Sequence, residues 1–597
     1  MRRREILKLA TLAPCAPLIL GGCATSLTYT AASPRRRVRP TDAAWPNMEN
    51  WQRLNEAVGG NLVPVQPLFA PCASLSGSAG CIDVSEHLSN PFYLGDQPAG
   101  TQVSGWLDAW TPAPSVYAIK ARTTADIVAG VNFARLHNLR LVVKGTGHSY
   151  LGTSNAADSL LIWTRAMNRV QLLDAFVPRG CSDAPVPAVT AEPGAVSIDL
   201  YYAVTTGAGR YVQAGGCTDT GIAGLIQSGG FGSFSKGYGT AASSLLEAEV
   251  VTADGSVLTA NACLNPDLFW ALKGGGGGTF GVITRATLQT HDLPKSFGGA
   301  SASIKAHSDA AFKQLIAQFL TFYQESLLNP HWGEQVKFGP DNTLEISMAS
   351  QGVEQDQLYQ IWKPFMDWMK ASAQDFTVTH PFAYAVPART FWDVENNPSM
   401  VHDTRPGSPK QHCWWRGDQG QVGAFLHGYD SLWLPAALLA PNTRQRFVDA
   451  LFAASRFKQV QLHLNKGLAG ATPGALSAAR QTATNPAVLT AFALAIIADG
   501  EGPAYPGMPR PAQNLTAAHA DSRAIDRAAA ELRKLVPDAG SYVSESNYFN
   551  PSWQHAYWGD NYPRLRAIKK RYDPDGLFFV HHGVGSEDWS PDGFTRR

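Results

Sequence analysis

Glycine gathers in three stretches of the first half of this 597-residue chain, and apolar segments that favour regular structure flank each stretch. The first, residues 145–152, follows the β-branched run Leu141–Val143. The second extends from Gly215 to Gly239, and the third is Gly274–Gly278. Glycine has no side chain and weakens helices and strands, so these stretches favour close approach of bare backbone to a large ligand.

Two familiar phosphate-binding motifs do not fit the first stretch. The dinucleotide fingerprint needs its third glycine earlier than Gly152. It also needs a helix directly afterwards, and residues 155–159 are a poor start for a helix. Residues 147–152 have the glycine spacing of a P-loop, but Thr153 stands where the phosphate-binding lysine belongs. This stretch by itself supports two interpretations equally: a strand that turns sharply beneath a pyrophosphate, and an ordinary turn in which His148 is there by chance.

The second stretch is not expected to be a linker, because regular secondary structure is predicted directly after it. A strand is expected over Leu246–Thr252, and the hairpin turn Ala253-Asp254-Gly255 follows it directly. A helix over Pro266–Leu272 and a strand over Phe280–Leu288 enclose the third stretch in the same way. The economical interpretation is that one large ligand contacts all three.

Composition bounds the protein class. With 45% hydrophobic and 16% charged residues the chain is globular, and its length favours two domains with extensions. A formal net charge of +1 argues against nucleic acid as a partner. The absence of any C-x-x-C pattern argues against a zinc site, and we predict no bound metal.

The N-terminus has the pattern of an export signal. Arg3-Arg4-Glu5-Ile6-Leu7-Lys8 fits the twin-arginine pattern, and a short apolar segment follows it. Leu20-Gly21-Gly22-Cys23 resembles a bacterial lipobox, which predicts a lipid anchor at Cys23 and an exported, periplasmic or membrane-anchored lipoprotein. Ordinary signal cleavage beside a chance cysteine is the alternative.

Cysteine usage agrees with an oxidising compartment. The short loop from Cys72 to Cys81 is rich in serine and glycine and is expected to close as a disulfide. Cys181, Cys263 and Cys413 cannot be paired from sequence.

From Trp110 the chain alternates strands and helices, with Thr123 or Thr124 as the N-cap of a helix over residues 125–138. Near Pro294 the glycine clusters end, and amphipathic segments such as Ala311–Glu325 and Val353–Lys370 begin. We therefore divide the chain into a signal and tether (1–39), an N-terminal extension (40–109), a ligand-binding domain (110–294), a capping substrate domain (295–520) and a C-terminal segment that returns to the first domain (521–597).

Five ordered motifs then resemble the berberine-bridge-enzyme-like branch of the vanillyl-alcohol oxidase / p-cresol methylhydroxylase (PCMH) flavoprotein superfamily. They are residues 145–152, 215–221 with 229–232, 268–276, 281–284, and 558–574. The resemblance implies an α+β fold, in which a PCMH-type FAD-binding domain of two α+β subdomains is combined with an α/β cap. It also implies FAD as the cofactor.

The same resemblance assigns site residues. His148 matches the histidine bonded to the flavin 8α-methyl group, and Cys217 matches the cysteine bonded to the 6-position, although Thr220 replaces the usual valine. Cys217 as a plain buried thiol or a disulfide partner is the alternative. The other residues expected to contact FAD are Lys144, Gly145, Thr146, Gly147, Ser149, Tyr150, Gly152, Gly216, Gly221, Gly224, Gly229, Gly230, Gly232, Val282, Tyr548 and Asn550.

For catalysis, Tyr548 with Asn550 matches the Y-x-N segment whose tyrosine serves as base in related carbohydrate oxidases, although Tyr548 that only packs on the flavin is nearly as well supported. The expected reaction is oxidation of an alcohol or sugar-type substrate, with hydride transfer to flavin N5 and oxygen as acceptor. A sugar that stacks on Trp414-Trp415 is favoured slightly over phenolic or alkaloid-like alcohols. A dehydrogenase with a quinone or cytochrome acceptor, and a non-catalytic binding lipoprotein, are the rival functions.

Overall fold

In the computed structural model of this chain, residues 36–73 and 77–597 are described. The twin-arginine pattern, Cys23 and most of the expected tether lie outside these residues. Within them, no helix is long and apolar enough to cross a membrane.

The first sheet contains the strand that leads into the first glycine stretch. Its four strands lie in the order β1-β3-β5-β4, and β5 pairs in parallel with both β3 and β4. Helix α4 begins at the capping box of Thr123 and Asp126, as the sequence predicts, and its buried face packs against this sheet together with α1. The bounds are β1 Leu62–Pro64, β3 Tyr117–Lys120, β4 Arg140–Lys144, β5 Ser159–Trp163, α1 Met48–Ala57 and α4 Thr124–Leu136.

The second sheet is antiparallel, and the other two glycine stretches precede its interior strands β9 and β11. Its order is β10-β9-β11-β7-β6, and the predicted turn at Gly255 joins β9 to β10. The bounds are β6 Val170–Phe176, β7 Val186–Ala191, β9 Leu245–Val251, β10 Val257–Asn261, β11 Val282–Gln289, α5 Ser197–Leu200, α6 Ile222–Ser228, α7 Ser235–Tyr238 and α8 Pro266–Leu272.

Within the described residues, two disulfides form, and their four cysteines all lie before residue 264. Cys72–Cys81 forms as the loop composition predicts. Cys181–Cys263 was not predictable, because 82 residues separate its cysteines and only the folded sheet brings them together.

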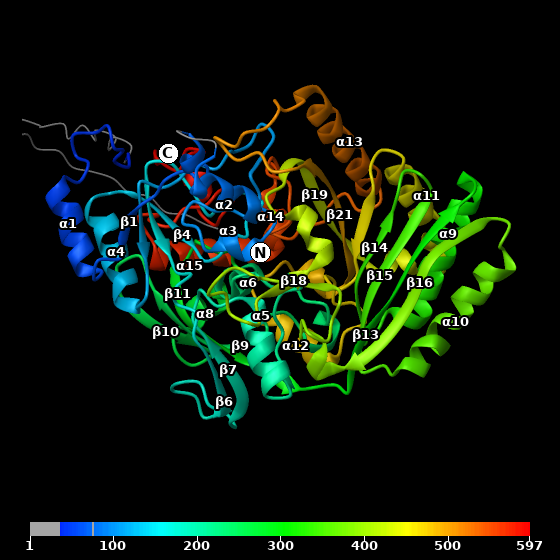
Figure 1. Cartoon of the computed structure of the whole chain (residues 1–597). Helices are drawn as coiled ribbons and strands as arrows, with labels where there is room; N and C mark the ends of the chain where they lie inside the picture. The colour runs from blue at the N-terminus through cyan, green and yellow to red at the C-terminus, as the bar shows by residue number, and fades with distance from the viewer. Residues whose placement is uncertain (1–35, 74–76) are drawn as a thin grey trace, which may run out of the picture. The chain divides into compact units, whose positions relative to one another are not determined.

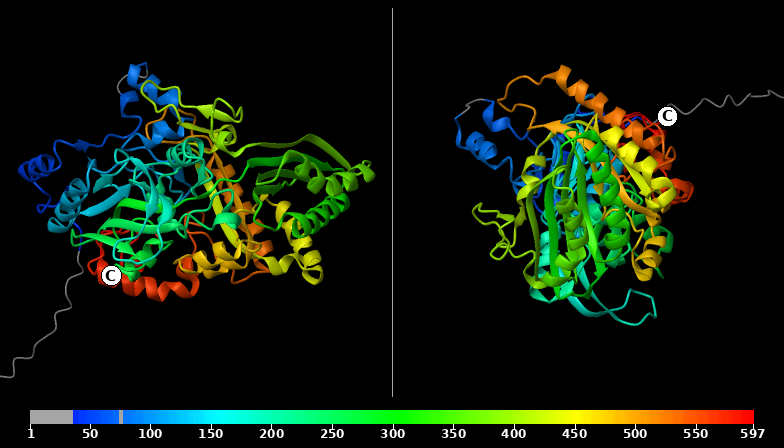
Figure 2. Two further views of the ribbon diagram at one scale, coloured as in Figure 1. Left: turned by 90° about the horizontal axis from the view of Figure 1, so that it is seen from below. Right: turned by 90° about the vertical axis from the view of Figure 1, so that its right-hand side faces the viewer.

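A mixed sheet of eight strands forms the cap. Its order is β16-β13-β15-β14-β20-β21-β19-β2, and helices α9, α10, α11 and α13 pack on one face of it (Figures 1 and 2). The bounds are β13 Ser296–Ala306, β14 Trp332–Phe338, β15 Thr343–Gln351, β16 Phe376–Pro387, β19 Phe425–Pro435, β20 Val460–His463, β21 Ala491–Glu501, α9 Asp309–Phe322, α10 Gln355–Ala371 and α11 Pro441–Ser455.

Two segments extend the cap beyond its predicted range of 295–520. Strand β2 (Gly105–Trp106) comes from the N-terminal extension and pairs in parallel with β19. Helix α13 (Leu515–Arg533) crosses the predicted boundary, because Ile525, Ala528, Ala529 and Leu532 bury its apolar face against the cap.

The C-terminal segment returns to the first domain. Helices α14 (Trp553–Trp558) and α15 (Tyr562–Tyr572) lead to Phe578, which bridges to Leu141 of β4. The Lys569 ammonium is fully enclosed and donates to the carbonyl of Thr279 at 2.6 Å and to the Asp573 carboxylate at 2.6 Å. This lysine therefore ties the C-terminal segment to the third glycine stretch.

Replacing Lys569 with Met should destabilise the protein by about 3–5 kcal/mol, because the buried Asp573 carboxylate loses its cation. The matched control is Lys570→Met on the same helix, whose side chain is exposed. Denaturant unfolding of the two variants compares them directly. Equal losses of stability would show that the Lys569 contacts do not hold the segment.

Candidate active site

One large cavity lies where the three glycine stretches, the cap sheet and the C-terminal segment meet. Its volume is about 1410 Å³, which exceeds the roughly 300–1,000 Å³ typical of small-molecule sites. The walls come from residues 143–151, 215–228, 276–283, 415–422, 542–545 and 580–583, and from strands of the cap. A long cofactor together with a substrate fits a space of this size.

Several glycines on the wall leave backbone bare toward the cavity. A Cβ added at Gly224 would meet no protein atom within 4 Å, and at Gly277 it would meet only the Cβ of Gln227, at 4.0 Å. At Gly145 its nearest neighbour would be the Pro193 carbonyl oxygen, at 3.5 Å. These three residues have no left-handed φ and little local crowding, so packing within the protein does not explain glycine there. A cofactor that contacts the backbone would explain why glycine stands at these positions. The residues present therefore fit FAD.

Other predicted glycines serve the fold instead. Gly229 and Gly230 have φ of 114° and 74°, and a Cβ at Gly232 would lie 2.2 Å from the Ala214 carbonyl oxygen. At Gly152 a Cβ would strike the Trp110 ring at 2.5 Å. None of these four glycines lines the cavity. Glycine stands at these positions because a turn or close packing within the protein leaves no room for a side chain.

The remaining predicted contact residues of the first two stretches, together with Val282, do line the cavity. They are Lys144, Gly145, Thr146, Gly147, His148, Ser149, Tyr150, Gly216, Cys217, Gly221, Gly224 and Val282.

Lys144 is engaged by the protein's own backbone. Its ammonium donates to the carbonyl oxygens of Gln97, Pro98 and Gly100 at 2.6, 2.8 and 3.0 Å. Burial lowers the pKa of Lys144 to about 7. Lys144 therefore positions the start of the first glycine stretch, with its three donors directed at these carbonyls and not at a ligand.

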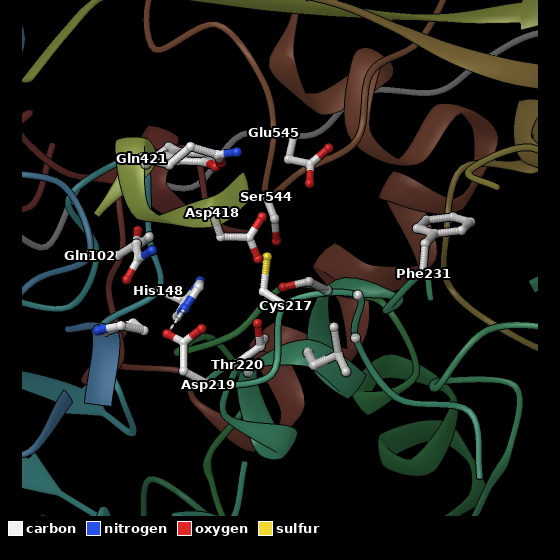
Figure 3. A pocket seen from close by; sticks show the side chains of 18 of the residues that line it. Gln102, His148, Cys217, Asp219, Thr220, Phe231, Asp418, Gln421, Ser544 and Glu545 are labelled. Atoms are coloured by element: carbon white, nitrogen blue, oxygen red, sulfur yellow. Dashed lines mark hydrogen bonds and ion pairs between the residues drawn. The ribbon is translucent and has the colours of Figure 1, made fainter. Parts of the chain in front are cut away.

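His148 meets Asp219 at the cavity wall, as the dashed line in Figure 3 marks. The contact uses Nε2 of the imidazole, and the Asp219 side chain is only 6% exposed. Burial by itself lowers the pKa of His148, but the charge and hydrogen bond of Asp219 outweigh it and raise that pKa above its usual value. Nδ1 is the ring nitrogen that this contact leaves for a ligand.

Cys217 lies two residues before Asp219, and its thiol points toward the Asp418 carboxylate (Figure 3). It is outside both disulfides, which removes the interpretation of Cys217 as a disulfide partner. Burial, and then the charges of Asp418 and Asp219, raise the pKa of the Cys217 thiol. His148 and Cys217 thus present a nitrogen and a sulfur to one cavity.

Asp418 comes from the cap segment between β16 and β19, which also brings Trp415 to the cavity. The indole of Trp415 donates to the Gly216 carbonyl at 3.2 Å. Burial, together with the charges of Asp219 and Glu334, raises the pKa of Asp418 to about 7. Sequence reasoning missed Asp418 because nothing near it in the chain marks it.

A charged network holds this cap segment on the first domain. Arg405 contacts Asp96 at 2.8 Å and Asp403 at 2.7 Å, and Arg165 reaches Asp96 at 2.9 Å. Asp403 also accepts from the Asn90 amide at 2.8 Å. These contacts position the chain that leads to Trp415 and Asp418.

Glu334 and Glu545 are among the further carboxylates that line the cavity, and neither was predicted. Glu334 accepts from the Ser233 hydroxyl and has φ of +68°, a strained backbone for a residue within a strand. Glu545 pairs with Lys466, whose ammonium lies 2.6 Å from one carboxylate oxygen. With Asp219 and Asp418 they place four carboxylates on the wall, which also includes Asp499, Glu501 and the cations Lys144, Lys337, Arg416 and Lys466.

Tyr548 and Asn550 do not line the cavity. The Tyr548 ring stacks on His581 with centroids 3.8 Å apart, and burial raises its pKa, which disfavours it as a base. The Asn550 side chain accepts from the Ser552 amide at 2.9 Å within a turn. Tyr542, Ser544 and Glu545, a few residues earlier, occupy the cavity wall instead.

Comparisons with known proteins show what this chain is similar to. Residues 115–261 match the family described as "FAD binding domain", and residues 541–585 match "Berberine and berberine like". The chain is 28% identical to "FAD-linked oxidoreductase patO" of Aspergillus clavatus over 96% of each protein. It is 25% identical to the solved VAO-type flavoprotein MtVAO615 of Myceliophthora thermophila, with a TM-score of 0.77 over 93% of this chain and 98% of that one.

A structure of glucooligosaccharide oxidase from Acremonium strictum is 18% identical, with a TM-score of 0.62 over 89% of this chain and 99% of that one, and supports the fold alone. The predicted α+β architecture, FAD as cofactor and oxidoreductase activity are thereby confirmed. The predicted resemblance to berberine-bridge-enzyme-like flavoproteins is confirmed as well, since the chain carries an FAD-binding region and a berberine-like region, and its relatives are FAD-linked oxidoreductases and VAO-type flavoproteins.

Proposed function

We propose that this protein is an oxidase that holds FAD by two covalent bonds and oxidises an alcohol or sugar-type carbon. The observation that carries the proposal is that His148, Cys217 and Asp418 face one cavity from three separate segments (Figure 3). Two residues suited to hold the cofactor thus share a space with a carboxylate suited to proton transfer.

Covalent attachment is supported by the chemistry of the two side chains. An imidazole nitrogen and a thiol are the nucleophiles that bond to a flavin ring, and both reach the cavity. The glucooligosaccharide oxidase from Acremonium strictum is described as carrying a 6-S-cysteinyl, 8α-N1-histidyl FAD. We assign the 8α bond to His148 and the 6-position bond to Cys217.

When bound, FAD supplies the acceptor for a hydride from the substrate carbon. The chain must then take the proton from the substrate hydroxyl, and we assign this role to Asp418. Its pKa of about 7 lies near neutral pH, where a general base works best. Its carboxylate faces Cys217, so it stands beside the part of the ring that this cysteine would hold.

For the substrate we favour a sugar, with phenolic or alkaloid-like alcohols as the alternative. The exposed Phe382 and its neighbour Tyr384 line the cavity, with ring centroids 5.4 Å apart, and Trp415 adds a third aromatic wall. Aromatic faces of this kind stack on pyranose rings and on planar rings alike. Trp414 is buried beside Phe92, so only one of the predicted tryptophan pair reaches the site.

We also infer that the protein is exported. The twin-arginine pattern of residues 3–8 supports this inference, and so do the disulfides Cys72–Cys81 and Cys181–Cys263, since disulfides persist in oxidising compartments. A lipid anchor at Cys23 remains a prediction. Fractionation of the producing cells and mass spectrometry of the mature N-terminus test both points.

Flavin fluorescence on a denaturing gel tests covalent attachment. FAD should remain bound to the unfolded wild type, to His148→Ala and to Cys217→Ala, and only the double variant should release it. Mass spectrometry of each protein checks the added mass. Free FAD from the unfolded wild type would contradict attachment, and a colourless folded protein would favour a non-catalytic binding protein.

Asp418→Asn should lower kcat/KM by about 10²–10⁴-fold, because a general base of this kind contributes that much. In the wild type kcat/KM should rise with pH through about 7, as the Asp418 carboxyl loses its proton, and then level off. The variant should lack this rise while its flavin spectrum is retained. If the rise of kcat/KM with pH were unchanged in Asp418→Asn but absent in Tyr548→Phe, Tyr548 and not Asp418 would be the base.

Peroxide yield decides the electron acceptor. An oxidase should form about one hydrogen peroxide for each substrate oxidised in air-saturated buffer, since each hydride carries two electrons to one dioxygen. A coupled peroxidase assay beside product quantification measures this ratio. Turnover that proceeds only with an added quinone or cytochrome would identify a dehydrogenase.

A further inference from the structure

Asp219 stands between two backbone positions that are fixed to the same helix start. The Thr218 carbonyl accepts from the Ile198 amide at 2.9 Å, and the Thr220 carbonyl accepts from the Ser197 amide at 3.0 Å. These two hydrogen bonds fix the backbone on both sides of Asp219 and so set the direction of its side chain. Its carboxylate contacts His148 Nε2 at the cavity wall.

The residues on either side of His148 are fixed as well. The Gly147 carbonyl accepts from the Gln102 amide at 3.0 Å, and the Ser149 hydroxyl accepts from the Thr153 amide at 3.0 Å. The imidazole and the carboxylate thus meet between two rigid supports, which is the arrangement of a reactive group and the residue that orients it.

We propose that Asp219 is the positioning residue for covalent attachment of the flavin at His148. Its carboxylate accepts the Nε2 hydrogen, which keeps the lone pair on Nδ1 and directs that nitrogen at the 8α-carbon. It also stabilises the positive charge that the ring acquires as the new bond forms. The inference rests on the proposed covalent attachment and adds which residue selects the bonded nitrogen.

The attachment reaction balances with dioxygen as oxidant. A C–H bond of the 8α-methyl group breaks with loss of the proton to solvent, and Nδ1 of His148 forms a C–N bond to that carbon. The electron pair released reduces the isoalloxazine ring by two electrons. Dioxygen then takes the two electrons and two protons as hydrogen peroxide. Throughout the bond-forming step Nε2 keeps its hydrogen toward Asp219.

A purely structural ion pair would behave differently from a positioning residue. Removing it would lower the stability of the protein, but it would leave the rate of attachment and the nitrogen used unchanged. Asn at position 219 preserves the shape of Asp yet can donate its amide hydrogen to Nε2, which favours the Nδ1–H tautomer and removes the attacking lone pair. Exchange of Asp for Asn beside a reactive histidine costs about 10⁴-fold in a well-studied triad for this reason.

The test uses the full-length chain with Cys217→Ala, so that His148 is the only expected attachment site. Protein produced with limiting riboflavin is supplied with FAD, and samples are precipitated with acid over time to measure covalent flavin. Asp219→Asn and Asp219→Ala are compared with Asp292→Asn, a matched change at an exposed aspartate that does not line the cavity. NMR of the isolated flavin peptide identifies the bonded nitrogen.

We expect Asp219→Asn to slow attachment at least about 10²-fold, while Asp292→Asn attaches at the rate of its parent. In Asp219→Ala, which has no partner for Nε2, a fraction of the product should be bonded through Nε2. The parent should show Nδ1 alone. Retention of FAD under native conditions and unchanged circular dichroism confirm that each variant is folded.

Attachment in Asp219→Asn at the parent's rate and through Nδ1 would overturn the inference. If Asp219→Ala fails to fold, the isosteric Asp219→Asn decides the question by itself. If instead the Cys217→Ala parent carries no flavin on His148, the proposed covalent attachment fails, and that failure is seen before any variant of Asp219 is compared.

Discussion

An uncovered backbone around one cavity is the constraint on which the rest of this structure depends. A space of about 1410 Å³ removes from the interior the side-chain contacts that normally fill a core. Glycines on the wall, such as Gly224 and Gly277, have no side chain that could pack against the rest of the protein. The walls therefore need support from contacts that lie behind them.

Buried lysines supply much of that support by donating to backbone carbonyls. Lys144 holds the segment at residues 97–100 beneath the first glycine stretch. Lys236 reaches from the second stretch to the carbonyls of Leu464 and Phe492 in the cap, and Lys569 joins the C-terminal segment to the third stretch. An ammonium group offers three donors at one point, so each lysine ties together segments that have no sheet pairing with one another.

Charge is distributed unevenly around the cavity. Asp219, Asp418, Glu334 and Glu545 face it, while Lys466 is the cation paired with Glu545. Burial of Asp418, together with the negative charges of Asp219 and Glu334, makes ionisation of Asp418 less favourable and holds its pKa near neutrality. Within this cluster of carboxylates, Asp219 lies beside His148 and Asp418 lies beside Cys217.

The sequence by itself determined the local features of this protein. The cap of α4 at Thr123, the bounds of α8 and the Cys72–Cys81 disulfide follow from short motifs, because capping, turn formation and close loop closure act within a few residues. His148 and Cys217, which were singled out by the family resemblance, both line the cavity. The tertiary structure alone decided that Asp418, Glu545 and Lys466 share the cavity, and that Cys181 pairs with Cys263. It also separated the bare glycines from those that packing requires, such as Gly232. Segments hundreds of residues apart meet at these positions, and the encounter depends on chain topology, which no local pattern of residues encodes.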